Sequence, residues 1–234
     1  MIQLSAHHVW YLIMAAQWTV LLSLVAFAGG ALVGLPIALM RVSPSNALRI
    51  VASGYIQLIQ GTPLLILLFL TYFGLGILGY KLAPLVAAGL ALTLYAAAFL
   101  GEIWRGCIEA VPRTQWEASD CLGLDRFQQY AYVILPQAFK MAIPPTVGFM
   151  VQIVKNTSLA SVVGFVELAR AGQIVNNSTF EPFIIFCIVA AIYFAMCYPL
   201  SLASRFLERR ANAGSASERA MATRCCWPPE SCSG

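Results

Sequence analysis

The side chains best suited to hold a small charged solute stand together in the second half of the chain. Lys155 begins a polar segment that continues with Asn156, Thr157 and Ser158. These residues supply several hydrogen-bond donors and acceptors where a helix is expected to end, and such a set could hold an α-carboxylate. Lys155 could equally extend toward a membrane interface as a long cationic side chain. A binding role and a structural role are equally open.

Two further features are candidates for a solute path. Gly61, Thr62 and Pro63 would break a hydrophobic helix at membrane depth, where irregular backbone is allowed only if it lines a cavity or is buried in protein. Glu102 lies near the end of another hydrophobic segment. Ionisable residues in membrane spans are costly, so Glu102 is a candidate functional residue. Arg105 lies at helical spacing from Glu102, so we favour an ion pair at a helix end for Glu102.

The composition is that of a protein embedded in a membrane. Of its 234 residues, 60% are hydrophobic and 10% are charged, whereas about 25% of residues are charged in a typical soluble domain. Hydrophobic runs of about 20 residues can cross a bilayer as helices. We place five spans at 18–40, 51–80, 82–100, 137–154 and 183–207. The sequence therefore predicts an all-α, polytopic transmembrane helical bundle over residues 1–210.

Two of these spans are irregular. The segment 51–80 is too long for one upright helix, so we expect it to be tilted or to begin as a cytoplasmic extension. In the segment 137–154 we expect Pro144, Pro145 and Gly148 to break the helix. Neighbouring helices can cover the backbone groups that such a break sets free.

Basic residues near the span ends set the expected orientation. Arg41 and Arg49 lie between the first two spans, whereas only Lys81 lies between the second and third. Because cytoplasmic loops are enriched in Lys and Arg, we expect the N-terminus outside, the segment 101–136 in the cytoplasm, the segment 155–182 outside and the C-terminus in the cytoplasm. The net charge of +4 then reflects topology. Nucleic-acid binding is not expected, since the basic residues do not cluster on one face.

The sequence gives little support for metal binding, disulfide bonds or catalysis. The seven cysteines and two histidines give no complete zinc set, and several cysteines fall in membrane or cytoplasmic segments where no disulfide framework is expected. A membrane-embedded enzyme would have no histidine beyond His8 to use. We expect no metal and no catalytic residue. The last segment, 211–234, lacks periodicity, so we predict a disordered cytoplasmic tail.

The segment 112–136 is a charged, helix-forming insert between hydrophobic runs. Pro112 suits the first turn of a helix, and Gly123 can take the left-handed conformation that ends one. We predict a short helix over 112–122 that lies along the membrane surface and presents small residues outward. A second helix is expected over 124–134, ended by the proline that follows. From physics alone, the insert could contact another protein or be an ordinary amphipathic loop.

The insert also carries a recognisable pattern. Its members are Glu117, Ala118 and Ser119, then Gly123, and finally Leu135 and Pro136. This pattern resembles the coupling loop of ABC-importer permeases, which has the form Glu-Ala-Ala, then Gly, then an apolar residue and Leu-Pro. Ser119 replaces the second Ala, a change that a docking helix surface is expected to tolerate.

Further motifs extend the resemblance to the polar amino-acid branch of that family over about residues 15–210. They are Gln60-Gly61-Thr62-Pro63-Leu64-Leu65, Glu102-Ile103-Trp104-Arg105-Gly106, Pro136-Gln137-Ala138, Lys155-Asn156-Thr157-Ser158-Leu159 and Leu207-Glu208-Arg209-Arg210. The first motif usually begins with Arg, so an ionic role of position 60 is absent here or moved. In amino-acid permeases the segment that matches Lys155 lies near the translocation path.

The resemblance implies a permease subunit that moves a polar amino acid across the bacterial cytoplasmic membrane by alternating access. Implied partners are two cytoplasmic ATPase subunits, a second permease copy or a sister permease, and an extracytoplasmic amino-acid-binding protein. The chain has no Gly-rich phosphate loop ending in Gly-Lys-Ser/Thr, so it is not expected to be an enzyme, and ATP and Mg²⁺ are expected in the ATPase partner. A rigid element in 112–136 could transmit closure of the ATPase subunits to the spans.

Two alternatives remain. A permease for another small solute would share the coupling loop, while the Lys155 segment is less widely shared. A secondary transporter would need no ATPase, but it would usually carry repeated spans and intramembrane carboxylates. The sequence has no visible internal repeat and no carboxylate well inside a predicted span.

Residues 160–178 alternate apolar and small polar side chains. Glu167 and Arg170 lie at helical spacing within this stretch. We predict an external amphipathic gate here, in reach of the binding protein.

Overall fold

The computed structural model describes residues 6–225, with side chains for residues 6–210. Within this range the chain is helical and has no strand. The elements are α1 (Ala6–Val42), α2 (Asn46–Gly61), α3 (Leu64–Phe69), the π-helical turn η1 (Leu70–Gly74), α4 (Leu75–Ile77), α5 (Pro84–Glu109), α6 (Arg113–Cys121), α7 (Arg126–Gln128), the π-helical turn η2 (Gln129–Ile134), α8 (Leu135–Asn156), the 3₁₀ helix η3 (Thr157–Val163), α9 (Leu168–Thr179) and α10 (Pro182–Cys225).

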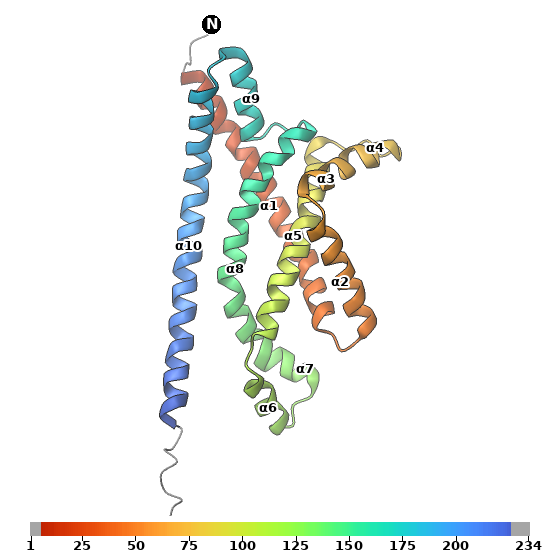
Figure 1. The fold of residues 1–234 in the computed structure, drawn as a ribbon, viewed down its shortest axis with the longest axis vertical. Helices are drawn as coiled ribbons and strands as arrows, with labels where there is room; N and C mark the ends of the chain where they lie inside the picture. The colour runs from red at the N-terminus through yellow and green to blue at the C-terminus, as the bar shows by residue number, and fades with distance from the viewer. Residues whose placement is uncertain (1–5, 226–234) are drawn as a thin grey trace, which may run out of the picture.

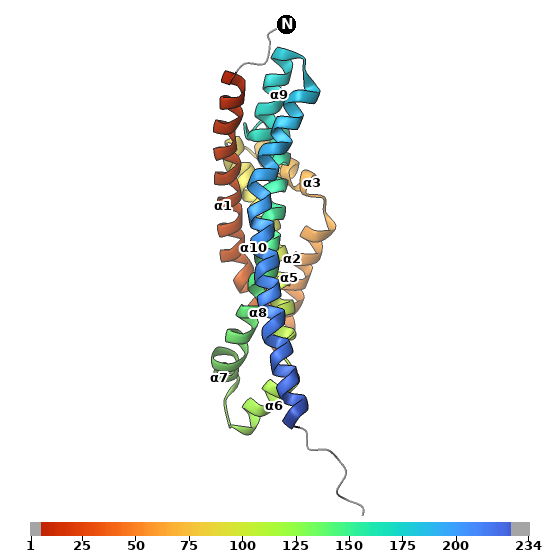
Figure 2. The ribbon, with the colours of Figure 1, turned by 90° about the vertical axis from the view of Figure 1, so that its left-hand side faces the viewer.

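Three helices, α1, α5 and α10, are long and apolar enough to cross a membrane. Two bent pairs are further candidates: α2 with α3–α4, at 101°, and the segment from α7 to η3 with α9, at 51°. The five predicted spans thus correspond to three straight candidates and two bent ones. The start of α1 lies with α9 at one end of the molecule, and α6 lies with the C-terminal end of α10 at the other (Figure 1, Figure 2).

Small residues let α1 and α5 pack closely. A Cβ added at Gly30 of α1 would stand 2.4 Å from the Cβ of Ala96 on α5. One turn further, a Cβ at Gly34 would stand 3.0 Å from the carbonyl oxygen of Ala97. Such close backbone approach is typical of small residues at membrane helix interfaces. The two helices therefore form a fixed pair.

Buried apolar side chains form two main clusters. The central core joins α1, α2, α3, α5, α8 and η3, and its fully buried members include Leu22, Leu68, Leu92, Leu100 and Ile153. The second core joins the first half of α1 with α9 and the start of α10. It consists of Leu12, Ala15, Leu168, Ala171, Val175, Ile185 and Val189. Two smaller clusters lie at the base of α6 and between α8 and α10.

The predicted helix breaks are confirmed in one case and wrong in the other. Gly61 ends α2 and Pro63 precedes α3, so the segment 51–80 is a bent pair and not one tilted helix. In contrast, α8 continues through Pro144 and Pro145. Ser204 of α10 donates a hydrogen bond to the carbonyl of Pro144 at 3.1 Å. Packing of α10 and α5 against α8 explains why the prolines do not interrupt it.

The helix predicted to end at Pro136 does not end there. It begins with a capping box, in which Asp125 accepts from the Gln128 N–H at 2.8 Å and Gln128 accepts from the Asp125 N–H at 3.1 Å. It continues through η2 directly into α8, and Pro136 occupies the first turn of α8. The π-helical turn absorbs the change in hydrogen bonding that proline requires.

The last helix is longer than predicted. The span was expected to end at 207 and a disordered tail to begin at Ala211, but the backbone of α10 stays helical through Cys225. Alanine recurs through this stretch, and it has the highest intrinsic helix propensity. The part of the predicted tail at 226–234 lies outside the described residues.

Candidate functional site

The predicted coupling helix is α6, a nine-residue helix at one end of the molecule (Figure 1). Pro112 is its N-cap residue, and Gly123 follows its C-cap with a φ of +71°. The Gly123 N–H donates to the Asp120 carbonyl at 3.0 Å, and the Leu124 N–H donates to the Ser119 carbonyl at 3.2 Å. These two bonds make a Schellman motif. The predicted start and end of the helix are confirmed.

The inner face of α6 is fixed to the rest of the chain. Ser119 is only 1% exposed, and its hydroxyl donates to the Trp116 carbonyl at 2.7 Å. Trp116 packs edge-on against Tyr130 of η2. Gln129, also buried, donates to the Asp120 carboxylate. Ser119 therefore faces the body of the protein, contrary to the expectation that it lies on an outward docking surface.

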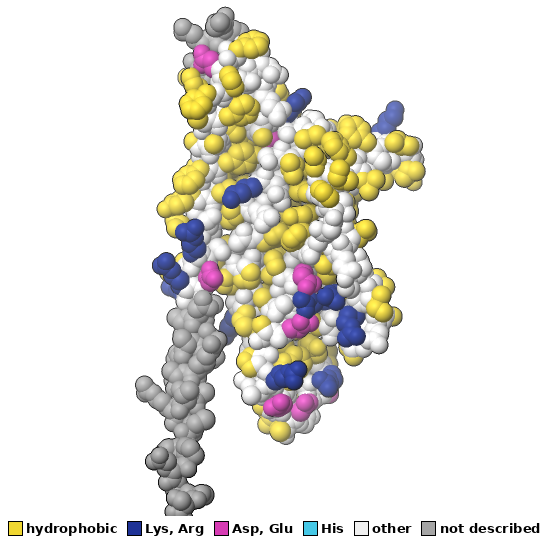
Figure 3. Space-filling model, in the orientation of Figure 1, with side chains coloured by type: hydrophobic (Ala, Val, Ile, Leu, Met, Phe, Trp, Pro, Cys, Tyr) yellow, Lys and Arg dark blue, Asp and Glu magenta, His cyan; other side chains and the backbone are white. Residues whose placement is uncertain are grey.

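The outer face of α6 is exposed and mixed in character. Glu117 and Ala118 are exposed as predicted. Two large apolar side chains nearby in sequence are also exposed: Leu122, the C-cap of α6, at 77% and Phe127 of α7 at 78%. Charged side chains gather at this end of the face seen in Figure 3, below a mostly hydrophobic surface. Phe127 was not predicted to be a surface residue of interest, although it is an aromatic residue within the polar stretch from Asp125 to Gln128.

The base of α6 joins three membrane-length helices. Buried Ile108 of α5 and Val111 just after it pack with Ile134 of η2 and Ala138 of α8. The Tyr130 hydroxyl donates to the carbonyl of Val42, the last residue of α1, at 3.3 Å. The base of α6 is thus packed, directly or through η2, against the ends of α1, α5 and α8.

An ion-pair cluster lies near the end of α5. Arg105 Nε donates to Glu102 Oε1 at 2.9 Å, and the same guanidinium pairs with Glu109. Arg41 of α1 lies 3.7 Å from the other Glu102 oxygen. The predicted Glu102–Arg105 pair is confirmed, and Arg41 extends it to a second helix. The end of α5 packs near the start of α8, whereas η3 follows the end of α8.

The Lys155 segment marks a helix end, as predicted. Lys155 is exposed in the last turn of α8, and Asn156 is its final residue. Thr157 is fully buried and donates to the Val154 carbonyl at 2.7 Å, while Ser158 donates to the Lys155 carbonyl at 2.7 Å. Both hydroxyl oxygens keep acceptor capacity. Because the ammonium group is exposed and Thr157 is buried, these residues do not line one enclosed pocket.

The break at 61–63 lies on a neighbouring element. Thr62 donates to the Leu58 carbonyl at 2.7 Å, and Gly61 and Pro63 are exposed. The following helix, α3, contacts η3, and Leu64 shares the central core with Ala160. Two of the predicted path segments, 61–63 and 155–158, are thus brought to adjacent elements.

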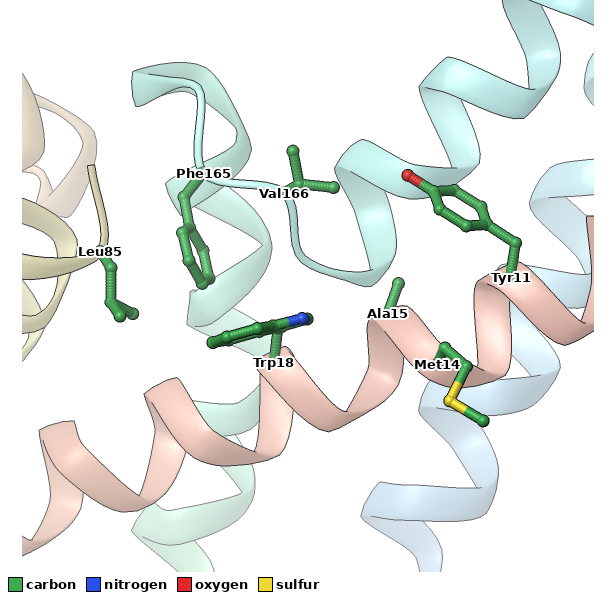
Figure 4. A pocket seen from close by; sticks show the side chains of 7 residues that line it. All are labelled: Tyr11, Met14, Ala15, Trp18, Leu85, Phe165 and Val166. Atoms are coloured by element: carbon green, nitrogen blue, oxygen red, sulfur yellow. The ribbon is translucent and has the colours of Figure 1, made fainter. Parts of the chain in front are cut away.

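A pocket of about 380 Å³ opens between α1, the start of α5 and the linker before α9 (Figure 4). Its lining residues are Tyr11, Met14, Ala15, Trp18, Leu85, Phe165 and Val166. The Tyr11 hydroxyl and the Trp18 indole N–H are the only polar side-chain groups in this set. No predicted path residue lines the pocket, and its walls offer no charged partner for a carboxylate.

Glu167 is buried and was not predicted to be. The segment 160–178 was expected to be one external amphipathic gate, but it is divided between η3 and α9. Glu167 is the N-cap of α9 and is fully buried. Its carboxylate accepts from the backbone N–H groups of Ala169 and Arg170, each at 2.9 Å. A single acidic residue among apolar ones was the available signal.

These features define a class of protein: a polytopic membrane protein with a rigid helical projection at one end. The family follows from sequence comparison. The family model described as "Binding-protein-dependent transport system inner membrane component" matches residues 30–213. The chain belongs to this family and is a membrane component of a transport system.

Curated relatives match most of the chain. The probable amino-acid ABC transporter permease protein YckA of Bacillus subtilis (strain 168) is 34% identical over 200 residues, which cover 86% of this chain and 88% of the relative. The L-cystine transport system permease protein TcyB of the same strain is 37% identical over 194 residues, covering 82% of this chain and 83% of the relative.

Solved structures share the fold. A crystal structure of an amino acid ABC transporter with histidines contains a chain that is 35% identical to this one, with a TM-score of 0.84, over 89% of this chain and 100% of that one. An inward-facing structure of the MetNI methionine ABC transporter reaches a TM-score of 0.74 at 22% identity, over 89% of this chain and 99% of that one. The second likeness concerns the fold alone.

Proposed function

We propose that this chain is the permease subunit of an ATP-driven importer that moves a polar amino acid across the bacterial inner membrane by alternating access. The observation that carries the mechanism is the geometry of α6: a capped helix with an exposed Glu117–Ala118 face whose base is joined to α1, α5 and α8. A rigid element of this kind transmits force, whereas a flexible loop would absorb it. The substrate class is supported by the names of relatives such as YckA and TcyB.

The docking partner in this proposal is a dimer of ATPase subunits. Glu117, Ala118, Leu122 and Phe127 form the exposed contact surface, while Ser119, Gly123, Leu135 and Pro136 fix its shape. ATP and Mg²⁺ belong to the ATPase, because this chain contains no phosphate-binding Gly-rich loop. A second permease copy or a sister permease and an extracytoplasmic amino-acid-binding protein complete the transporter.

The solute path in this proposal runs past η3. Thr157 and Ser158 offer hydroxyl groups there, Lys155 offers a cation at the end of α8, and α3 brings the 61–63 break alongside. Glu102 serves the fold through its ion pairs with Arg41 and Arg105.

Co-purification from native membranes tests the proposal. The tagged permease is extracted in detergent, co-eluting subunits are identified, and ATP hydrolysis is measured with a panel of amino acids and the binding protein. We expect an ATPase partner whose turnover rises with one polar amino acid. Stimulation by a different class of small solute would contradict the substrate class, and a chain that purifies alone and transports in vesicles would identify a secondary transporter.

A further inference from the structure

The carboxylate of Glu167 joins α9 to two other helices. Its Oε2 atom accepts a hydrogen bond from the hydroxyl of Tyr193 on α10 at 2.7 Å. The Thr19 hydroxyl of α1 donates to the same oxygen at 3.4 Å, and the Thr19 oxygen accepts from the Leu168 N–H at 3.1 Å. Together with its two backbone N–H donors, Glu167 connects residues that are 148 and 26 positions away in the chain.

The network stands where the two cores meet. Val163 and Phe165 belong to the central core, whereas Leu168 belongs to the second core. Between them, Gly164 has a φ of +85°, and the helical segments on either side are bent by 51°. The linker 164–167 is thus a change of direction held in place by one buried carboxylate.

Separating these helices would be costly. A buried carboxylate that loses its donors pays a large desolvation penalty, and hydrogen bonds to a charged group are about twice as strong as neutral ones. Tyr193 and Thr19 would also lose their partner in a buried site. The helices α1, α9 and α10 are therefore expected to move together at this end of the molecule.

The same α1 helix reaches the other end of the protein. Val42, its last residue, accepts the hydrogen bond from Tyr130 at the base of α6. From Thr19 to Val42 the helix covers about 35 Å at 1.5 Å per residue. Pro36 lies within this stretch, yet the helix continues through it, and it packs closely against α5 at Gly30 and Gly34. A continuous element thus connects the α6 base with the Glu167 network.

We propose that Glu167 is a positioning residue that fixes the linker before α9 to α1 and α10, so that a displacement of α6 reaches the η3 segment through α1. The inference rests on the proposed transport function. It differs from a local helix-capping role in one respect: the bonds to Thr19 and Tyr193 are needed in addition to the cap.

Three substitutions separate these roles. Glu167→Asp keeps a carboxylate for the cap, since Asp is a favoured N-cap residue, but is one methylene too short to keep both long-range bonds. Tyr193→Phe and Thr19→Val each remove one hydroxyl that is bonded to Glu167 and keep the two bonds from the Ala169 and Arg170 N–H groups to its carboxylate. Thr19→Val also removes the acceptor of the Leu168 N–H, so Tyr193→Phe is the cleaner of the two. Tyr198→Phe is the matched control, because it makes the same change on α10 at a residue that is 51% exposed.

The experiment measures ATP hydrolysis by the reconstituted transporter with and without the loaded binding protein. We expect basal hydrolysis and co-elution with the ATPase to be unchanged, and the stimulated increment to fall about tenfold in each of the three variants, with Tyr198→Phe like wild type. Thr19→Val combined with Glu167→Asp should cost less than the sum of the two.

Full stimulation in Thr19→Val and Tyr193→Phe would overturn the inference and leave Glu167 as a local cap. These two variants keep the test decisive even where Glu167→Asp does not assemble. A wild-type transporter that no amino acid stimulates would instead overturn the proposed function, and the inference with it.

Discussion

Trp116 of α6 packs edge-on against Tyr130 of η2, with ring centroids 5.1 Å apart and ring planes at 79°. An aromatic pair of this geometry contributes about 0.5–1.5 kcal/mol beyond the area it buries. The Tyr130 hydroxyl continues the contact to the Val42 carbonyl at the end of α1. Two aromatic side chains thus connect an exposed helix to α8, through η2, and to α1. Trp116 thus joins α6 to the rest of the chain from the side of η2.

Glu117→Lys reverses a charge on the exposed face of α6. We expect uptake and co-elution with the ATPase to fall at least about tenfold, since a like-charge contact at an interface costs several kcal/mol. Membrane insertion should be normal, because Glu117 is exposed. Glu181→Lys, at the opposite end of the molecule between α9 and α10, is the control. Normal uptake in Glu117→Lys would contradict the coupling role of this face.

Gly30→Ala tests the close approach of α1 and α5. The new Cβ would stand 2.4 Å from the Ala96 Cβ, so the helices must separate. We expect a loss of about 1–3 kcal/mol in stability, the usual cost of overpacking, seen as a lower thermal unfolding midpoint in detergent. Gly54→Ala on α2 is the control, because nothing lies within 4 Å of its Cβ and alanine favours helix. Equal midpoints for the two variants would contradict the packing described.

Glu102→Gln separates a structural role from a solute-path role. It leaves Arg41 and Arg105 without their shared carboxylate. We expect the stability to fall by about 1–2 kcal/mol, as for a partly buried bond between charged groups, with the substrate concentration for half-maximal uptake unchanged. Glu109→Gln is the control, since it removes another partner of Arg105 at a more exposed site. A change in the substrate concentration for half-maximal uptake would instead indicate that Glu102 lies on the solute path.

Local signals predicted the features that depend on neighbours in sequence. The start and end of α6 follow from Pro112 and Gly123, and the Glu102–Arg105 pair follows from their spacing of three. The spans follow from hydropathy. An apolar segment in lipid must pair its backbone groups within itself, so a long hydrophobic run predicts a helix. These properties require no knowledge of tertiary contacts.

Features that depend on distant partners were not predictable. Which face of α6 is buried depends on where η2 lies, so Ser119 was assigned outward. The continuity of α8 through Pro144 and Pro145 is accompanied by packing against α5 and α10, which lie elsewhere in the chain. The spacing of Glu167 and Arg170 indicated a local pair along one helix. The side chains that bond the Glu167 carboxylate, Thr19 and Tyr193, come from other helices.

Lys155→Met tests the cation among the proposed path residues. The change removes a cation and keeps an unbranched side chain of similar length, so α8 should end as before and assembly with the ATPase should persist. We expect the substrate concentration for half-maximal uptake to rise at least about tenfold, since a charged hydrogen bond to a carboxylate contributes roughly 1.5–3 kcal/mol. Lys140→Met, at an exposed position on the same helix, should transport like wild type. If both variants transport normally at every substrate level, Lys155 is a solvated helix-end residue and the carboxylate site lies elsewhere on the path.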